Sequence, residues 1–175
     1  MRWTIRRAED SDLRFLQEML LEAANWRSGN RPTDRNDVLT DPHVARYPGR
    51  VGPGRRHRAP GAGRTRQPAG AAWFRFFSRD EPTFGFIDET IPELSIAVRG
   101  DCRGCGIGTR LLNALIGVAR EKGVRALSLS VEEDYPALRL YERSGFRSVE
   151  KKDNAHTMRL DFESGPPKEH FGSDR

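Results

Sequence analysis

The chain has 175 residues, of which 36% are apolar and 31% are charged, and its formal net charge is +5. A chain of this length suits one domain that buries about two-thirds of its surface, so it does not depend on disulfides for stability. It contains no apolar run long enough to span a membrane, and residues 1–12 have no signal-peptide core. We therefore expect a cytoplasmic protein.

The N-terminal part predicts a short strand followed by helices. Residues 4–6 have the pattern of a strand, and Asp10 or Ser11 can cap the next helix because their side chains accept hydrogen bonds from unpaired N–H groups. Apolar residues then recur at helical spacing over residues 13–23. A second short helix is expected around residues 33–41.

Residues 48–70 differ in composition from the rest of the chain. They contain six Gly, four Pro and six Arg, and Val51 is their only large aliphatic residue. Such a segment has too little apolar surface to offset the entropy lost on ordering, so it predicts a disordered or irregular basic loop. The six arginines carry one charge more than the net charge of +5, so the rest of the chain has a formal charge of about −1. They have no aromatic residues among them for base stacking, which makes nucleic-acid binding an unfavoured alternative.

Strands and helices alternate after this segment. The helix expected at 106–122 has a long apolar stripe, and Gly123 is a suitable C-terminal stop. We predict one domain over residues 1–162 and a polar tail over 163–175. The other expected elements are strands at 71–77, 94–98, 126–131, 146–149 and 157–162, and a short helix at 136–144.

A glycine-rich turn, Arg103-Gly104-Cys105-Gly106-Ile107-Gly108, connects one of these strands to the long helix. Glycine lets backbone N–H groups approach a ligand closely, and the helix N-terminus carries a partial positive charge. The turn is therefore suited to binding a diphosphate, although a purely structural turn would have the same pattern. A Walker A loop is excluded because Gly108 is followed by Thr109 and Arg110 instead of Lys and Ser/Thr, and the G-x-G-x-G spacing does not fit a dinucleotide fingerprint.

No metal site is expected. Cys102 and Cys105 have C-x-x-C spacing, but a tetrahedral zinc site needs four ligands and the chain has no second cysteine pair. The four histidines have no paired spacing either.

The turn and three further segments each match a known sequence motif. Arg103, Gly106 and Gly108 match the Gln/Arg-x-x-Gly-x-Gly/Ala loop, and residues 94–98 match the strand before it. Leu140-Tyr141-Glu142-Arg143-Ser144-Gly145-Phe146 matches a late Leu-Tyr-x-x-x-Gly-Phe signature, and residues 5–13 match a typical opening. The chain resembles the GNAT acetyltransferase superfamily in these segments.

The resemblance implies an α/β fold with a mixed, mostly antiparallel central sheet flanked by helices. The strands at 94–98 and 126–131 would splay apart to admit acetyl-CoA, the co-substrate of the family. Its pantetheine arm would bond to the backbone of Ile96, Ala97 and Val98, like an added strand. Its diphosphate would lie on the N–H groups of Arg103, Gly104, Cys105, Gly106, Ile107, Gly108 and Thr109.

The resemblance also implies direct attack of an amine on the thioester. Tyr141 matches the position of the family's acid, with simple packing of its ring as the alternative. Glu93 lies near a common position of the base, with a solvated charge at a strand end as the alternative, and Asp88 and Glu89 are less favoured substitutes. Tyr135 replaces an Asn that contacts the cofactor in many relatives.

A second departure concerns residues 52–62, where relatives have a hydrophobic strand. Two accounts are open for the Pro/Gly/Arg-rich sequence found there. One is a natural insertion in which the strand is lost or replaced, and the other is local out-of-frame translation of GC-rich DNA. Sequencing the coding DNA decides between them, because the second account requires another frame that encodes a hydrophobic strand.

The function that the resemblance implies is an acyltransferase, specifically an N-acetyltransferase that moves the acetyl group of acetyl-CoA to a primary amine. The alternative is a catalytically impaired acyl-CoA-binding or regulatory module. The acceptor would lie near Trp26, Arg27 and residues 78–92, which carry no recognisable specificity code. No membrane partner is expected, and the sequence is compatible with a homodimer.

Overall fold

The computed structural model describes residues 3–24, 56–64 and 67–162, and they contain a seven-stranded sheet of order β1-β2-β3-β4-β5-β7-β6. Neighbouring strands run antiparallel, except β4 and β5, which are parallel. The strands are β1 (Thr4–Arg6), β2 (Arg56–Arg64), β3 (Gln67–Arg75), β4 (Glu93–Val98), β5 (Ala126–Glu132), β6 (Arg147–Lys152) and β7 (Ala155–Asp161). The helices are η1 (Asp10–Asp12), α1 (Leu13–Ala24), η2 (Gly100–Cys102), α4 (Ile107–Glu121) and α5 (Leu138–Arg143). The mixed, mostly antiparallel sheet flanked by helices is as predicted.

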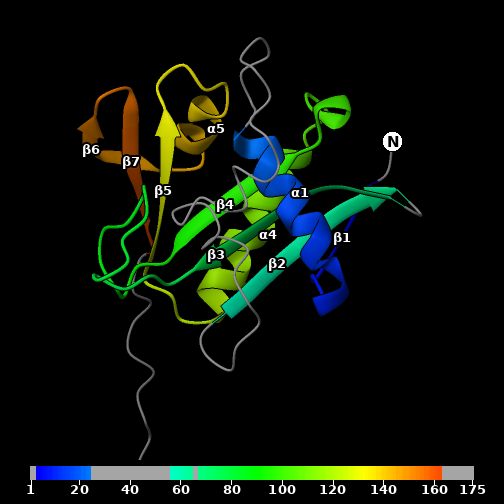
Figure 1. Ribbon diagram of the computed structural model, residues 1–175, viewed down its shortest axis with the longest axis horizontal. Helices are drawn as coiled ribbons and strands as arrows, with labels where there is room; N and C mark the ends of the chain where they lie inside the picture. Colours follow the sequence, from blue (N-terminus) through cyan, green and yellow to red (C-terminus); the bar gives the residue numbers. More distant parts are fainter. Residues whose placement is uncertain (1–2, 25–55, 65–66, 163–175) are drawn as a thin grey trace, which may run out of the picture.

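Helices cover both faces of the sheet, because successive side chains of a strand point to opposite faces. In β3, Ala71 and Trp73 pack against α1, whereas Ala72 and Phe74 belong to the core beneath α4. Figure 1 shows α1 crossing one face and α4 lying on the other. None of the described helices is long and apolar enough to cross a membrane.

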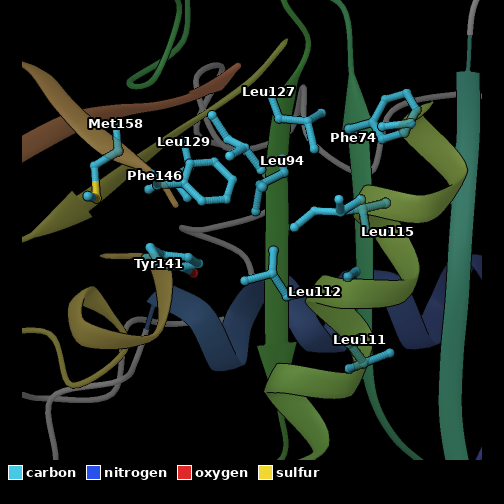
Figure 2. Close-up of a cluster of buried hydrophobic side chains, with 14 of the residues drawn as sticks. Phe74, Leu94, Leu111, Leu112, Leu115, Leu127, Leu129, Tyr141, Phe146 and Met158 are labelled. Atoms are coloured by element: carbon cyan, nitrogen blue, oxygen red, sulfur yellow. The ribbon is translucent and has the colours of Figure 1, made fainter. Parts of the chain in front are cut away.

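The main core lies between one face of the sheet and the helices α4 and α5 that cover it (Figure 2). The apolar stripe predicted for α4 is buried there, and Leu111, Leu112 and Leu115 have no exposed surface. Leu127, Leu129 and Val131 meet them from alternate positions of β5, as the strict alternation of that segment predicts. This core fixes α4, and with it the glycine turn at the start of α4.

One part of the sequence prediction is wrong. Residues 56–64 form β2 and residues 67–70 begin β3, within the segment 48–70 that was expected to be a disordered or irregular loop. Residues 48–55 and the pair 65–66 lie outside the described residues. The physical reason is that strand pairing uses backbone N–H and C=O groups, which every residue except proline supplies in full whatever its side chain.

Strand β2 lies between two partners that together specify its place. It pairs antiparallel with β1 and with β3, so both of its edges are hydrogen-bonded. Its register against β3 shifts between Arg58 and Gly61, the stretch that contains Pro60, which lacks a ladder donor. The strand that the family resemblance predicts near residues 52–62 is therefore present at residues 56–64, in a sequence without large apolar residues.

Candidate active site

The sheet opens between β4 and β5. These two strands are paired only at Glu93 and Ser128, where the Ser128 N–H donates to the carbonyl of Pro92 at 3.0 Å. On its other edge β4 stays paired with β3 along its whole length, from Glu93 to Val98. Beyond Glu93, the edge of β4 that faces β5 thus has no strand partner among the described residues, as the splay prediction requires (Figure 1).

The backbone groups on this open edge belong to alternate residues. The Arg99 N–H donates to the Ala69 carbonyl of the β3 segment at 2.9 Å. Since antiparallel pairing alternates, the backbone groups of Ala97 also face β3, and those of Ile96 and Val98 face the opening. An extended ligand arm could therefore add to β4 through Ile96 and Val98, with Ala97 holding the strand between them.

The glycine turn follows directly. Gly104 and Gly106 have φ angles of 73° and 75°, a left-handed conformation that favours glycine. Helix α4 begins at Ile107 with no side-chain cap, so the N–H groups of its first turn have no partner from a capping residue. Residues 103–106 are exposed. This arrangement has the backbone geometry that the predicted anion site requires.

Gly108 lies between the end of β4 and helix α5. A Cβ atom placed there would be 3.9 Å from Cγ2 of Val98 on β4 and 3.7 Å from Cδ2 of Leu140 on α5. The glycine turn therefore lies at the same end of the opening as the C-terminus of β4, so one extended ligand could reach both.

The charge of Arg103 is already engaged. Its Nη2 lies 2.8 Å from Oε1 of Glu22 on α1, and its Nε donates to the carbonyl of Val98 at 3.2 Å. Tyr135 lies close enough for Arg103 to lower the pKa of its hydroxyl and for Glu22 to raise it, although burial raises that pKa most strongly. Tyr135, which the resemblance matches to an Asn in many relatives, thus lies near the ion pair of Arg103 and Glu22.

Tyr141 projects from α5 into the core. Its side chain is 5% exposed, and its ring packs edge-on against Phe146 with centroids 5.9 Å apart. Burial, and then the nearby hydroxyl of Tyr135, raise the pKa of Tyr141 above its ordinary value. In the view of Figure 2 its hydroxyl end points from α5 toward β4. A phenol in this setting keeps its proton across the neutral range.

Glu93 lies at the start of β4, next to the point where the strands separate. It is 3% exposed, so the alternative of a solvated charge at a strand end is wrong. Its Oε2 accepts a hydrogen bond from Oγ1 of Thr83. Because Leu94 enters the main core, Glu93 faces the other side of the sheet, and Tyr141 and Glu93 therefore approach the opening from opposite faces.

The two substitute bases are engaged elsewhere. Asp88 accepts hydrogen bonds from the backbone and hydroxyl of Thr90, which lower the pKa of its carboxyl group. Glu89 accepts a hydrogen bond from the backbone N–H of Arg79 at 2.9 Å. Both carboxylates therefore serve the local structure of the loop between β3 and β4.

No metal site is formed by the described residues, since they contain no group of three His, Cys, Asp or Glu side chains able to hold an ion. Cys102 and Cys105 are free thiols, and desolvation, followed by Asp101, raises the pKa of Cys102. A raised pKa opposes the thiolate form that metals bind.

Sequence reasoning missed three residues of this region. Thr83 bonds to Glu93, Gly85 packs on β5, and Glu22 pairs with Arg103. The only available signal was a glycine between two phenylalanines at Phe84-Gly85-Phe86. An isolated glycine in such a setting indicates close backbone approach, but not to which strand.

A sheet that opens between two parallel strands, with a glycine turn and an uncapped helix at the mouth of the opening, defines a fold of the acetyltransferase class. The model of the acetyltransferase (GNAT) family matches residues 21–146. The chain belongs to this family.

Two curated relatives match parts of the chain. A ribosomal protein bS18-alanine N-acetyltransferase of Haemophilus influenzae is 43% identical over 60 residues, which cover 34% of this chain and 41% of the relative. A mycothiol acetyltransferase of Corynebacterium aurimucosum is 36% identical over 84 residues, covering 47% of this chain and 26% of that protein. The chain thus spans less than half the length of these relatives.

Solved structures share the fold over nearly the whole chain. The structure of yncA from Salmonella typhimurium, determined with its cofactor acetyl-CoA, has a TM-score of 0.64 and 22% identity. The match covers 97% of this chain and 99% of that one. At this level of identity the likeness shows the fold.

Proposed function

We propose that this chain is an N-acetyltransferase that transfers the acetyl group of acetyl-CoA to the primary amine of an acceptor by direct attack. The observation that carries the proposal is the single pairing of β4 with β5 at Glu93 and Ser128, which opens toward an uncapped glycine turn. Family membership supports the same activity.

The residues present fit acetyl-CoA. Ile96 and Val98 would hold the pantetheine arm through backbone groups on the open edge of β4. The backbone N–H groups from Arg103 to Thr109 would hold the diphosphate, because Gly104 and Gly106 keep that surface free of side chains. The structure of yncA with acetyl-CoA supports this assignment by its fold.

Two side chains would carry out the proton transfers, Glu93 as the acceptor and Tyr141 as the donor. Bound acetyl-CoA would supply an acetyl group already activated as a thioester. The carboxylate of Glu93 would accept a proton from the incoming ammonium, directly or through water, because only the neutral amine is a nucleophile. The phenol of Tyr141 would donate its proton to the sulfur as the carbon–sulfur bond breaks. Its raised pKa keeps the hydroxyl protonated before the reaction, although it also makes the phenol a weaker acid.

The acceptor class is a primary amine. The matched relatives are named for the alanine of ribosomal protein bS18 and for mycothiol. The loop of residues 78–92, which lies over Glu93, would meet the acceptor. Trp26 and Arg27, also expected near the acceptor, lie outside the described residues.

A thiol-release assay tests the proposal. Purified protein is given acetyl-CoA with a panel of peptides carrying N-terminal alanine, peptides with a free lysine and small amines. We expect thiol release that depends on one amine class, with the acetylated amine confirmed by mass spectrometry. Tight binding of coenzyme A without release across the panel would instead support the impaired acyl-CoA-binding module.

A further inference from the structure

The carboxylate of Glu93 is held from the loop between β3 and β4. A buried carboxylate needs hydrogen-bond donors to offset its lost hydration, and Glu93 is 3% exposed. Oγ1 of Thr83 is one such donor, to Oε2. The contact joins residues ten positions apart, so it depends on how the loop folds back over the sheet.

The turn that carries Thr83 is fixed against β5. The N–H of Phe86 donates to the carbonyl of Thr83 at 3.2 Å and closes the turn. Gly85 within it is buried, and a Cβ atom there would lie 2.6 Å from the carbonyl carbon of Leu129 and 2.8 Å from Cδ of Glu93. Such close packing leaves the turn little room to shift, so the Thr83 hydroxyl has a defined position.

Other charged groups flank Glu93 within the sheet. Arg75 of β3 is its register partner. On the other side, Ser128 of β5 is paired with Arg159 of β7, which is bonded to Asp161. These groups are common to every variant considered below, so a difference between variants reports on the Thr83 hydroxyl.

We propose that Thr83 is the positioning residue for Glu93. Its hydroxyl selects the rotamer of the carboxylate and favours the ionised form, because a donor to a carboxylate stabilises its charge. The inference rests on the proposed function, since it concerns the proton acceptor for the amine. Thr83 itself does not touch the reacting atoms.

The first test needs no activity. Protein labelled with ¹³C at glutamate carboxyl groups is titrated by NMR without ligands, and Glu93→Gln assigns the Glu93 signal. In Thr83→Val the titration midpoint of Glu93 should move upward by about 0.5 to 1 pH unit, the equivalent of one net hydrogen bond. Thr83→Ser, which keeps the hydroxyl, should restore the wild-type midpoint.

A matched control comes from the same loop. Thr90 also donates its hydroxyl to a carboxylate, that of the more exposed Asp88. Thr90→Val therefore removes the same group from a side chain outside the site, and the Glu93 midpoint should not change. A midpoint that is equal in Thr83→Val and the wild type would overturn the inference.

The second test uses kinetics. Thr83→Val should lower kcat about tenfold and leave the Kd for coenzyme A unchanged, while the acidic limb of the pH profile moves to higher pH. In a Glu93→Gln background the same substitution should have no further effect, because Thr83 acts through Glu93. Additive losses in the double variant would overturn the inference.

The two levels of failure are distinguishable. A wild-type chain that transfers acetyl groups, with a Thr83→Val variant of the same rate and pH profile, would overturn the role of Thr83 alone. A wild-type chain that binds no coenzyme A and transfers nothing would overturn the proposed function, whatever the NMR titration shows.

Discussion

The guanidinium group of Arg103 in the glycine turn is bound to the carboxylate of Glu22 on α1, with Nη2 and Oε1 2.8 Å apart. The same nitrogen lies 3.5 Å from the backbone carbonyl of Glu22. Helix α1 is thus tied to the turn that would hold the diphosphate of coenzyme A. Glu22 places a negative charge beside the proposed anion site and pairs with a cation that the ligand could otherwise use.

Removing that charge should strengthen cofactor binding. Both side chains are partly exposed, at 40% and 33%, so the pair contributes less than about 1 kcal/mol to the free energy of unfolding. Glu22→Gln should raise the affinity for coenzyme A about two- to fivefold at low salt, and less at high salt. Glu18→Gln is the control, since Glu18 pairs with Arg14 one turn earlier. Isothermal titration calorimetry at two salt concentrations measures these affinities. A lower affinity for coenzyme A in Glu22→Gln than in the wild type, or equal affinities in Glu22→Gln and Glu18→Gln, would contradict the prediction.

Tyr141→Phe tests the acid. The substitution removes only the hydroxyl and keeps the ring that packs on Phe146, so the fold and the Kd for coenzyme A should be unchanged. Turnover should fall by a factor of about 100 or more, the usual contribution of a general acid. Equal turnover in the two proteins, measured by thiol release, would remove Tyr141 from this role.

The buried side chain of Tyr141 also predicts a loss of stability at high pH. Its pKa is raised by burial in the folded chain, whereas an unfolded tyrosine titrates near pH 10. The stabilisation is fully present below about pH 10 and is lost as the pH rises from there toward the folded pKa, because the unfolded state then releases its proton first. Between pH 9 and pH 11 the Tm of the wild type should fall more than that of Tyr141→Phe. Parallel Tm curves would contradict the burial of this group.

Gly85 should not tolerate a side chain. The nearest atoms to an added Cβ are the backbone of Leu129 and Ser130, at 2.6 and 2.7 Å, and backbone cannot move aside as a flexible side chain can. Gly85→Ala should lower the free energy of unfolding in urea by about 1 to 3 kcal/mol. Gly117→Ala is the matched control, because nothing lies within 4 Å of its Cβ position and alanine favours the interior of a helix by up to about 1 kcal/mol. Equal stability of the two variants would show that the turn does not press on β5.

The elements that apolar periodicity specifies could be predicted from the sequence. Helix α4 and strand β5 have clear patterns, since one side of each is buried in the same core. Strand β2 could not be predicted in this way, because its pairing with β1 and β3 comes from backbone groups and its sequence has no apolar pattern. Its place follows from its neighbours, which lie far from one another in the sequence.

The candidate site also contains residues that the sequence predicts and residues that it does not. The glycine turn and Tyr141 belong to local motifs, and a local motif can be recognised in one stretch of sequence. The contacts of Thr83 with Glu93 and of Glu22 with Arg103 join segments ten and 81 positions apart. Neither pair has a spacing that any secondary-structure period would produce, so only the fold reveals them.

A titration of ¹⁵N-labelled protein with coenzyme A, followed by the backbone amide signals, tests most directly whether the split strands and the helix mouth form one cofactor site. We expect saturable changes that are largest for residues 104–109, with a second group at Ile96 and Val98 on the open edge of β4. A folded protein whose amide signals do not move, or move only at other positions, would contradict the assignment of this opening to coenzyme A.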